Sequence, residues 1–303
     1  MSKEQKGLWL AWAGWRCRMP EDWRPVRIEG GWKNGLFVLS DAETPLLQIK
    51  WWRPGQKRFN AAGWIEKRLH KMKAGPQAGG APHPTDFDSV AWAPGEPGVR
   101  GFWYGYCASA DMMLELVISP EASKSQSRRI QRGMLESMRA SGVDEPVKWA
   151  VYAASFETPP GFELAEKHLH LGDVSLLLTA PKNRRMMVRQ VYPAELALER
   201  RKLDRWMMQK VYQQARKYKP HEDPQPWTLD LASSCAEGLV RRGRRRIAWP
   251  LGWIRPREAI TAALHDADVN RLLIAEYEAP READEAVLRS TLLAMNWAMR
   301  DDA

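Results

Sequence analysis

The amino-acid sequence predicts an α+β protein made of two tandem modules, each a mainly antiparallel sheet packed with helices. The chain has 303 residues, more than a single hydrophobic core usually organises, and 44% of them are apolar. Short apolar segments separated by turn residues recur in the same order in both halves. Such short reversals join antiparallel strands, because parallel strands need long crossovers.

Each half opens with a strand that leads to a proline and then to an aromatic residue. The two segments are residues 15–23 and 154–162, and in both the small or apolar residues alternate with polar ones. This alternation is typical of a strand with one buried face. It places Cys17 and Phe156 at corresponding inward positions.

Two more strands and a helix are expected next in each half, with Asp, Pro or Asn in the turns. Apolar residues recur at helical spacing over residues 62–72 and, in a longer stretch, over residues 196–218. The strands before these helices are expected at residues 35–39 and 46–51, and at 172–178 and 186–191.

Each half then closes with further strands and a final helix. Apolar stripes predict the final helices near residues 130–138 and 288–299. The polar stretch 144–146 ends in proline and suits a linker, so the modules are expected at residues 1–146 and 147–303. The late strands are expected at residues 89–92, 101–106 and 112–118, and at 237–240, 245–249, 259–264 and 271–277.

The order of these elements resembles the PsbP/Mog-like fold. The resemblance rests on the Pro–aromatic opening, the glycine that starts the second strand, the central helix, the late hairpin and the closing helix with Leu135-Glu-Ser-Met138. It covers most of both halves. It implies an antiparallel sheet between helices, and a protein-binding adaptor more often than an enzyme.

Charge and cysteine content indicate a soluble protein of a reducing compartment. The net charge is +9 and is spread over both halves, which favours anionic partners weakly without marking one nucleic-acid face. Three widely spaced cysteines predict no disulfide scaffold and a cytoplasmic location. The apolar stretch at residues 7–15 is short, rich in Trp and closed by Arg16 and Arg18, so neither an export signal nor a membrane span is expected.

The sequence contains none of the common motifs for nucleophilic, phosphate-binding, dinucleotide or zinc-protease sites, so no catalytic residue and no cofactor is predicted. His168 and His170 stand two apart, so on a strand they would share one face, but a third metal ligand such as His265 would come from a distant strand. We therefore predict no metal site, and a metal-dependent hydrolase remains an alternative. Cys107 has no base near it in sequence and is expected in the core.

The chain has 16 Trp residues, and two interpretations are open for them. Large rings with one N–H group suit core and rim packing, whereas exposed aromatic patches mark binding surfaces. Packing is the favoured interpretation, because exposed aromatic patches are the rarer case.

The strongest functional signal is basic. Five arginines surround a glycine, and a tryptophan follows, in a segment that we predict to be an exposed hairpin tip. Guanidinium groups bind phosphates and carboxylates in a bidentate way, so this tip is the predicted site for an anionic partner. The alternative is a solvated turn whose arginines pair with neighbouring acids. The predicted binding residues are Arg241, Arg242, Arg244, Arg245, Arg246 and Trp249.

These observations favour a non-enzymatic protein-binding or assembly adaptor built of two repeated α+β modules, with a protein partner. One alternative is a nucleic-acid-associated protein that uses the basic 241–246 hairpin. The sequence predicts no oligomeric state.

Overall fold

The computed structural model describes residues 7–42, 44–55, 58–72, 83–94, 98–152, 154–207, 218–220, 223–231, 234–245, 257–280 and 282–295. The chain divides into two compact units: unit 1 extends to Ser155, and unit 2 is Phe156–Met295. The division falls within the strand Ala154–Thr158, later in the chain than the linker predicted at residues 144–146.

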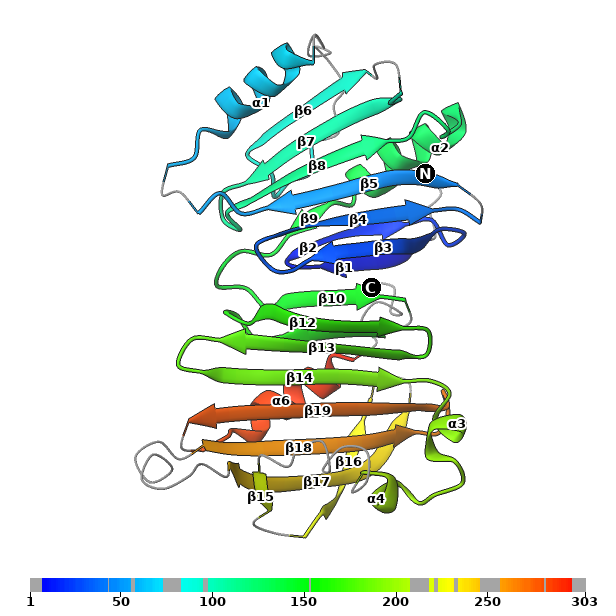
Figure 1. Ribbon diagram of the computed structural model, residues 1–303, viewed down its shortest axis with the longest axis vertical. Helices are drawn as coiled ribbons and strands as arrows, with labels where there is room; N and C mark the ends of the chain where they lie inside the picture. Colours follow the sequence, from blue (N-terminus) through cyan, green and yellow to red (C-terminus); the bar gives the residue numbers. More distant parts are fainter. Residues whose placement is uncertain are drawn as a thin grey trace. The chain divides into compact units, whose positions relative to one another are not determined.

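The structure is mainly β, with three antiparallel sheets and few helices (Figure 1). The antiparallel pairing that the short turns predicted is confirmed, but the α+β prediction gave the helices too large a share. The helix expected over residues 196–218 is an example. Its described part forms two short helices, α3 (Ala194–Leu198) and α4 (Leu203–Trp206), because Glu199 and Arg200 take left-handed backbone angles between them. Residues 208–217 lie outside the described ranges.

Unit 1 pairs its strands in two sheets, in the orders β10-β1-β2-β9 and β3-β4-β5-β8-β7-β6. Its helical segments are α1 (Ala61–Lys71), α2 (Lys124–Arg129) and the π-helical turn η1 (Ile130–Leu135). Its strands are β1 (Leu8–Trp12), β2 (Trp15–Met19), β3 (Arg24–Gly30), β4 (Asn34–Ser40), β5 (Pro45–Trp52), β6 (Ser89–Pro94), β7 (Gly101–Cys107), β8 (Met112–Ile118), β9 (Arg139–Ala140) and β10 (Val147–Val151).

Tryptophan side chains fill the space between the two sheets of unit 1. The ring of Phe37 on β4 lies 5.9 Å from Trp12 and 5.7 Å from Trp15, both edge-on. Trp15 also lies 6.2 Å from Trp51. Such edge-on and tilted pairs stabilise a core beyond the burial of their area. The packing interpretation is therefore confirmed for the fully buried rings, which are Trp12, Trp15, Trp51, Trp103 and Trp149.

Helix α1 packs on the β6–β8 half of the larger sheet in unit 1. Asn60 caps its first turn, with Oδ1 accepting from the Gly63 N–H group at 2.9 Å. Its buried residues follow a helical spacing and meet Tyr104, Tyr106 and Met113 of the sheet. The buried residues of α1 are Ala61, Ile65 and Leu69.

Unit 2 contains one large sheet in the order β12-β13-β14-β19-β18-β17-β15, and β16 also pairs with β17. Its last helix is α6 (Glu285–Leu293). β11 (Ala154–Thr158) contains the division between the units. The other strands are β12 (Glu163–His170), β13 (Asp173–Ala180), β14 (Arg184–Val191), β15 (Tyr218–Pro220), β16 (Gln225–Asp230), β17 (Cys235–Arg245), β18 (Arg257–Asp266) and β19 (Arg271–Pro280).

Helices pack on both faces of the unit 2 sheet. Thr291 of α6 contacts the sulfur of Met186 at 3.6 Å. On the other face, α3 and α4 form an apolar cluster with Met187 and Ile274. Met186 and Met187 are neighbours on one strand and so point to opposite faces. Within the described ranges, none of the helices has the length and apolar character that a membrane crossing requires.

The early strands of the second half recur at a constant distance along the chain from those of the first. β1 begins at Leu8 and β10 at Val147, and we call the separation of these two residues in the sequence the repeat interval. The same interval relates the bounds of β2 to β11 and of β5 to β14. A β-bulge lies between Pro25 and Arg27 in β3, and its counterpart one repeat interval later lies between Leu164 and Glu166 in β12. The sheet orders β3-β4-β5-β8-β7-β6 and β12-β13-β14-β19-β18-β17 also correspond.

Candidate binding groove on the sheet of unit 1

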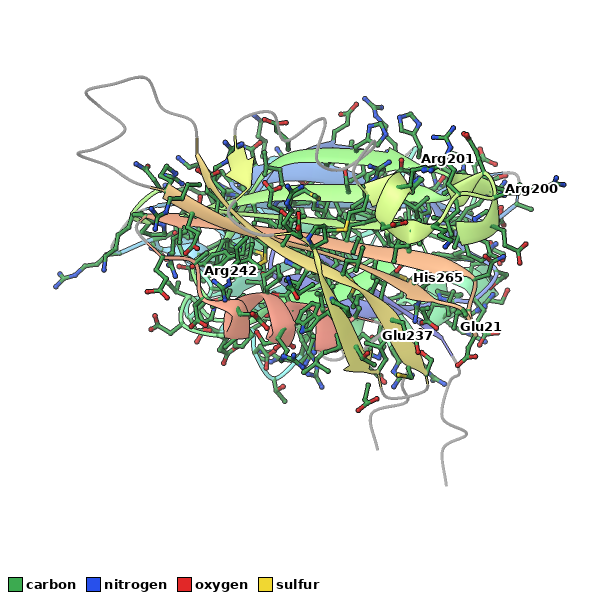
Figure 2. All side chains as sticks on the ribbon, turned by 90° about the horizontal axis from the view of Figure 1, so that it is seen from below. Glu21, Arg200, Arg201, Glu237, Arg242 and His265 are labelled. Atoms are coloured by element: carbon green, nitrogen blue, oxygen red, sulfur yellow. The ribbon has the colours of Figure 1, made fainter. Side chains whose placement is uncertain are left out.

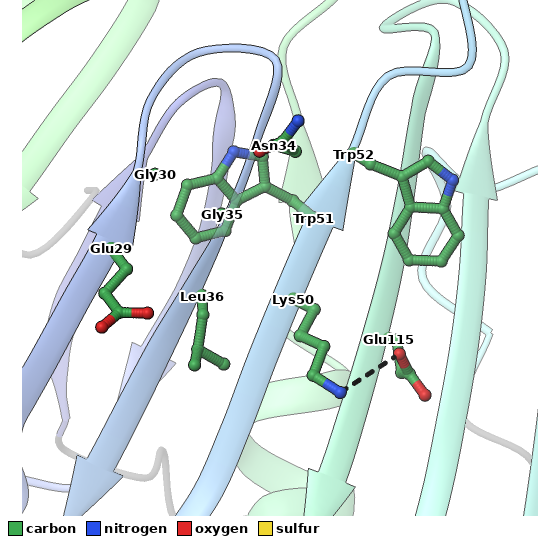
Figure 3. A pocket seen from close by; sticks show the side chains of 9 residues that line it. All are labelled: Glu29, Gly30, Asn34, Gly35, Leu36, Lys50, Trp51, Trp52 and Glu115. Atoms are coloured by element: carbon green, nitrogen blue, oxygen red, sulfur yellow. Dashed lines mark ion pairs between the residues drawn. The ribbon is translucent and has the colours of Figure 1, made fainter.

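A cavity of about 410 Å³ opens over the β3–β5 half of the larger sheet in unit 1, and we call it the Lys50 groove (Figure 3). It combines acidic, basic and aromatic side chains from four strands. The residues that line it are Glu29, Gly30, Asn34, Gly35, Leu36, Lys50, Trp51, Trp52 and Glu115.

The register of the sheet places the central residues of the groove in one row across the strands. Glu29 pairs with Leu36, Leu36 with Lys50, and Lys50 with Glu115. Glu115 in turn pairs with Tyr104 of β7. Directly paired residues of antiparallel strands share a face, so this row runs from the exposed Glu29 at the sheet edge to the buried Tyr104.

Glu115 is the buried acid of this row, since its side chain is only 8% exposed. Burying a carboxylate is costly unless cations and hydrogen bonds compensate it. Lys50 Nζ lies 3.7 Å from Oε2, and Arg68 Nη2 of α1 lies 3.7 Å from Oε1. The Tyr104 hydroxyl donates to Oε1 at 3.2 Å. The helix and the sheet thus share one polar network.

Burial raises the pKa of Tyr104 to about 12, and the negative charge of Glu115 adds to the rise. Tyr104 therefore keeps its proton at neutral pH and serves as a hydrogen-bond donor to Glu115. This chemistry fixes the position of the carboxylate at the inner end of the groove.

Two tryptophans define the rim and the floor of the groove. The half-buried Trp52 lies 5.0 Å from Trp64 of α1, so the rim continues onto the helix. Trp51 points to the opposite face of β5 and packs against Gly35, where an added Cβ would lie 2.2 Å from the ring. Only glycine fits at that position. Trp51 also donates its indole N–H to the Gly31 carbonyl at 3.1 Å.

The groove offers several kinds of contact along a short path. Glu29 is exposed, and the Lys50 side chain is 41% exposed, so both remain open to a ligand. Leu36 and Trp52 add apolar surface between these charges. Aromatic side chains are enriched in protein-recognition surfaces, and charges beside them select a partner of complementary charge.

The described part of the arginine segment, residues 241–245, forms a strand where the sequence predicted a hairpin tip. Residues 241–245 lie inside β17, where Arg242 pairs with Ile260 and Gly243 with Ala259 of β18. Gly243 lies in a regular sheet and not in a turn, because it pairs with Pro220 of β15 on one side and with Ala259 of β18 on the other. Arg244 is exposed, whereas Arg246 and Trp249 lie outside the described residues, as does the side chain of Arg245.

Two of the central arginines of this segment have internal interactions. Arg242 donates to Glu285 at 3.2 Å and to the Ala283 carbonyl at 3.2 Å, at the start of α6. Figure 2 shows Arg242 on the side of α6, with Glu237 and His265 toward the other end of the sheet. Arg241 is half-buried and also has a partner. Arg242 therefore pairs with a neighbouring acid, as the alternative prediction for this segment stated.

The structure places His168, His170 and Cys107 on strands of the sheets. The rings of His168 and His170 on β12 lie 4.1 Å apart. Among the residues that the structure describes, no three His, Cys, Asp or Glu side chains gather in a way that could hold a metal ion. Cys107 is fully buried, as expected, and its sulfur lies 3.2 Å from the Ser109 hydroxyl.

The sequence analysis missed Lys50, Glu115 and Trp52. One signal was available: Glu115 is the single charged residue of the strand 112–118, and a lone charge in an apolar strand requires a partner. The partner itself could not be found, since Lys50 and Arg68 are distant in sequence.

Comparison with known proteins adds no identity to this geometry. No protein family matches the chain, and no curated protein shows significant similarity to it.

Proposed function

We propose that this chain is a non-enzymatic binding protein made of two tandem α+β modules, and that the Lys50 groove receives a polar segment of a protein partner. The groove itself carries the proposal. It places the exposed Glu29, the accessible Lys50 and the aromatic Trp52 within one cavity. The aromatic rim is of the kind enriched at protein interfaces, and the charges of Glu29 and Lys50 can select a partner of complementary charge.

Support for tandem modules comes from the constant repeat interval, which separates Leu8 from Val147 at the starts of β1 and β10. The corresponding strands β3 and β12 differ in sequence but share a β-bulge at the same position, and their sheets share a strand order. Local backbone propensities alone do not produce both similarities. The PsbP/Mog-like resemblance and the cytoplasmic location stay predictions, and the resemblance favours the same class of function.

Two alternatives have less support from the described residues. Binding of nucleic acid by residues 241–246 would need free arginines, and Arg242 is held by α6. A metal-dependent hydrolase would need a third ligand next to His168 and His170.

A photo-reactive amino acid in place of Leu36 tests the proposal in the native cell. Leu36 lies in the groove, and Ser175, its counterpart one repeat interval later on β13, is the matched control position. We expect a discrete protein adduct at position 36 that Lys50→Glu abolishes and that position 175 does not give. Reversing the charge in the groove should repel a partner selected for the native charge.

Two results would count against the proposal. Identical adducts from positions 36 and 175 would show that the groove selects nothing. Adducts that disappear on nuclease treatment would support the nucleic-acid alternative instead.

A further inference from the structure

Helix α1 borders the inner end of the Lys50 groove, and this border carries two cations and two tryptophans. Lys50 and Trp52 are alternate residues of β5, so they lie on the same face of the strand (Figure 3). Trp64 and Arg68 are four residues apart on α1, so they share one side of the helix. The two tryptophan rings lie 5.0 Å apart, and Lys50 and Arg68 each lie 3.7 Å from the Glu115 carboxylate. We call the set of Lys50, Trp52, Trp64 and Arg68 the Arg68 site.

The Arg68 site carries more positive charge than the buried acid beside it requires. One cation compensates the single charge of Glu115, and the site supplies two. The side chains of Lys50 and Arg68 are 41% and 42% exposed, so both remain accessible to a further anion. At the outer end of the groove, Glu29 is already matched by Arg27 at 2.7 Å. The inner end therefore has one positive charge in excess.

The side of α1 that faces the groove is basic beyond Arg68. Lys71 follows Arg68 by three residues and is exposed, so it extends the basic side to the end of the helix. Glu66 is the one acid in the sequence of α1. It is two residues from both Trp64 and Arg68, which places it roughly 160° away around the helix axis. The acid of the helix therefore does not neutralise the site.

The repeated fold does not require these residues on the covering helix. One repeat interval after Trp64 and Arg68, unit 2 has Leu203 and Met207. Met207 is fully buried in the apolar cluster of unit 2, and Leu203 packs against that cluster. The corresponding helix positions are thus apolar and closed in unit 2, whereas in unit 1 they are aromatic and cationic and partly open.

We propose that the Arg68 site binds an acidic segment of the protein partner, with a carboxylate at Lys50 and Arg68 and an apolar side chain against Trp52 and Trp64. This inference rests on the proposed function and names the chemistry of the partner. Guanidinium and ammonium groups form charge-assisted hydrogen bonds with carboxylates. Tryptophan and arginine are the residues that most often dominate the binding energy of a protein interface.

The arrangement of charges fits a protein carboxylate better than a nucleic acid. A nucleic-acid backbone presents a row of phosphates and needs several cations along its path. In the row across the sheet, Glu29 and Glu115 lie on the two sides of Lys50, so a long polyanion would meet carboxylates there. A single carboxylate needs only the one charge that the site has in excess.

Fluorescence anisotropy of a labelled peptide with the full chain tests this site at constant ionic strength. The probe is a short peptide in which glutamate and leucine alternate, and the same peptide with glutamine in place of glutamate is the uncharged reference. We expect saturable binding of the glutamate peptide, and binding of the glutamine peptide that is weaker by about 10-fold or more. Arg68→Gln should weaken binding of the glutamate peptide by about 10-fold, and Arg68→Lys should weaken it less because the charge remains. Arg132→Gln, at an exposed arginine of η1, removes the same charge elsewhere and should leave binding unchanged.

A second variant keeps the test valid if Arg68→Gln fails to fold. Lys71→Gln changes an exposed residue at the end of α1, and we expect binding of the glutamate peptide to weaken by roughly 3-fold with the melting temperature unchanged. Equal binding of the two peptides would overturn the inference, as would undiminished binding in folded Arg68→Gln or, failing that, in Lys71→Gln. Tighter binding of a single-stranded oligonucleotide than of the glutamate peptide would also overturn it.

Cross-linking at position 36 separates this inference from the proposed function. A discrete adduct at Leu36 whose partner segment contains no acidic residue would leave the proposed function standing and overturn the inference. Binding of the glutamate peptide without any adduct at Leu36 would support the inferred chemistry of the site and contradict the proposed function.

Discussion

Lys50 in unit 1 and Arg189 in unit 2 are separated by one repeat interval and occupy corresponding places on the third strand of their sheets, yet they meet different neighbours. Lys50 faces the buried Glu115 of β8. Arg189 faces Ile274 of β19 and instead binds Asp173 of β13 through two hydrogen bonds, at 2.8 and 2.6 Å. The acid lies in the middle of one sheet and near the end of a strand in the other.

The covering helices explain this difference. In unit 1, α1 supplies Arg68, a second cation for Glu115. In unit 2, α4 contributes Trp206 to an apolar cluster that contains Ile274. One strand order therefore supports either a buried polar network or an apolar centre, and the residue on the covering helix determines which of them is stable.

The largest expected effect comes from exchanging the central residues of the two sheets. Ile274→Glu should lower the free energy of unfolding by about 3–5 kcal/mol, because Arg189, the cation opposite this position, is already bound to Asp173 and leaves the new buried carboxylate uncompensated. Glu115→Ile should cost only about 1 kcal/mol, since Lys50 and Arg68 are 41% and 42% exposed and stay solvated. Urea denaturation of both variants measures this asymmetry. Equal costs would show that the helix residue does not control the choice.

An intermediate effect is expected at alkaline pH, from Tyr104 in unit 1. The pKa of Tyr104 is raised to about 12 by burial and then by Glu115, whereas an unfolded tyrosine titrates near pH ~10. Between these values the unfolded chain has lost the proton and the folded chain retains it. Stability therefore falls as pH rises through this window. Unfolding measured across it should show a weaker fall in Tyr104→Phe than in the native chain; identical pH profiles would refute this contribution.

The smallest effect is expected from Arg189→Lys. The charge stays, but the two-pronged contact with Asp173 is lost, and both side chains are about one quarter exposed. The free energy of unfolding should fall by less than about 1 kcal/mol. Lys50→Arg is the matched substitution in unit 1, and it should change stability no more than that. A loss of several kcal/mol from Arg189→Lys would contradict this expectation and show that the Arg189–Asp173 pair is a major source of stability in unit 2.

Much of the strand order could be predicted from the sequence, because buried strands alternate or are continuously apolar and their turns contain Asp, Pro or Asn. Cys17 and Phe156 were predicted to be corresponding inward residues of the two halves. They are separated by one repeat interval, and both side chains are buried. Strands β3 and β12 were not predicted as elements. They lie at sheet edges, where one side has no partner strand and polar residues such as Glu29 and Glu163 are tolerated.

The Lys50 groove could not be predicted in the same way. The Lys50 groove depends on a register that aligns Glu29, Lys50 and Glu115 from three separate segments. The segment 241–246 was misread for a related reason. Five charges in six residues suggest an exposed hairpin tip, but residues 241–245 lie in a strand, from which Arg242 reaches Glu285 of α6.

The ladder between β1 and β10 has a consequence for the time course of synthesis. Ala11 pairs with Ala150, so β1 meets its own counterpart from one repeat interval later in the chain. At elongation rates of about 5–20 residues per second, β10 follows β1 out of the ribosome by roughly 7–28 seconds. During that interval the edge of β1 has β2 on one side and an open row of backbone donors and acceptors on the other. Neighbouring nascent chains on one messenger RNA expose the same edge of β1 at the same stage of synthesis. Until β10 emerges, a strand of another nascent chain can therefore pair with β1 in its place.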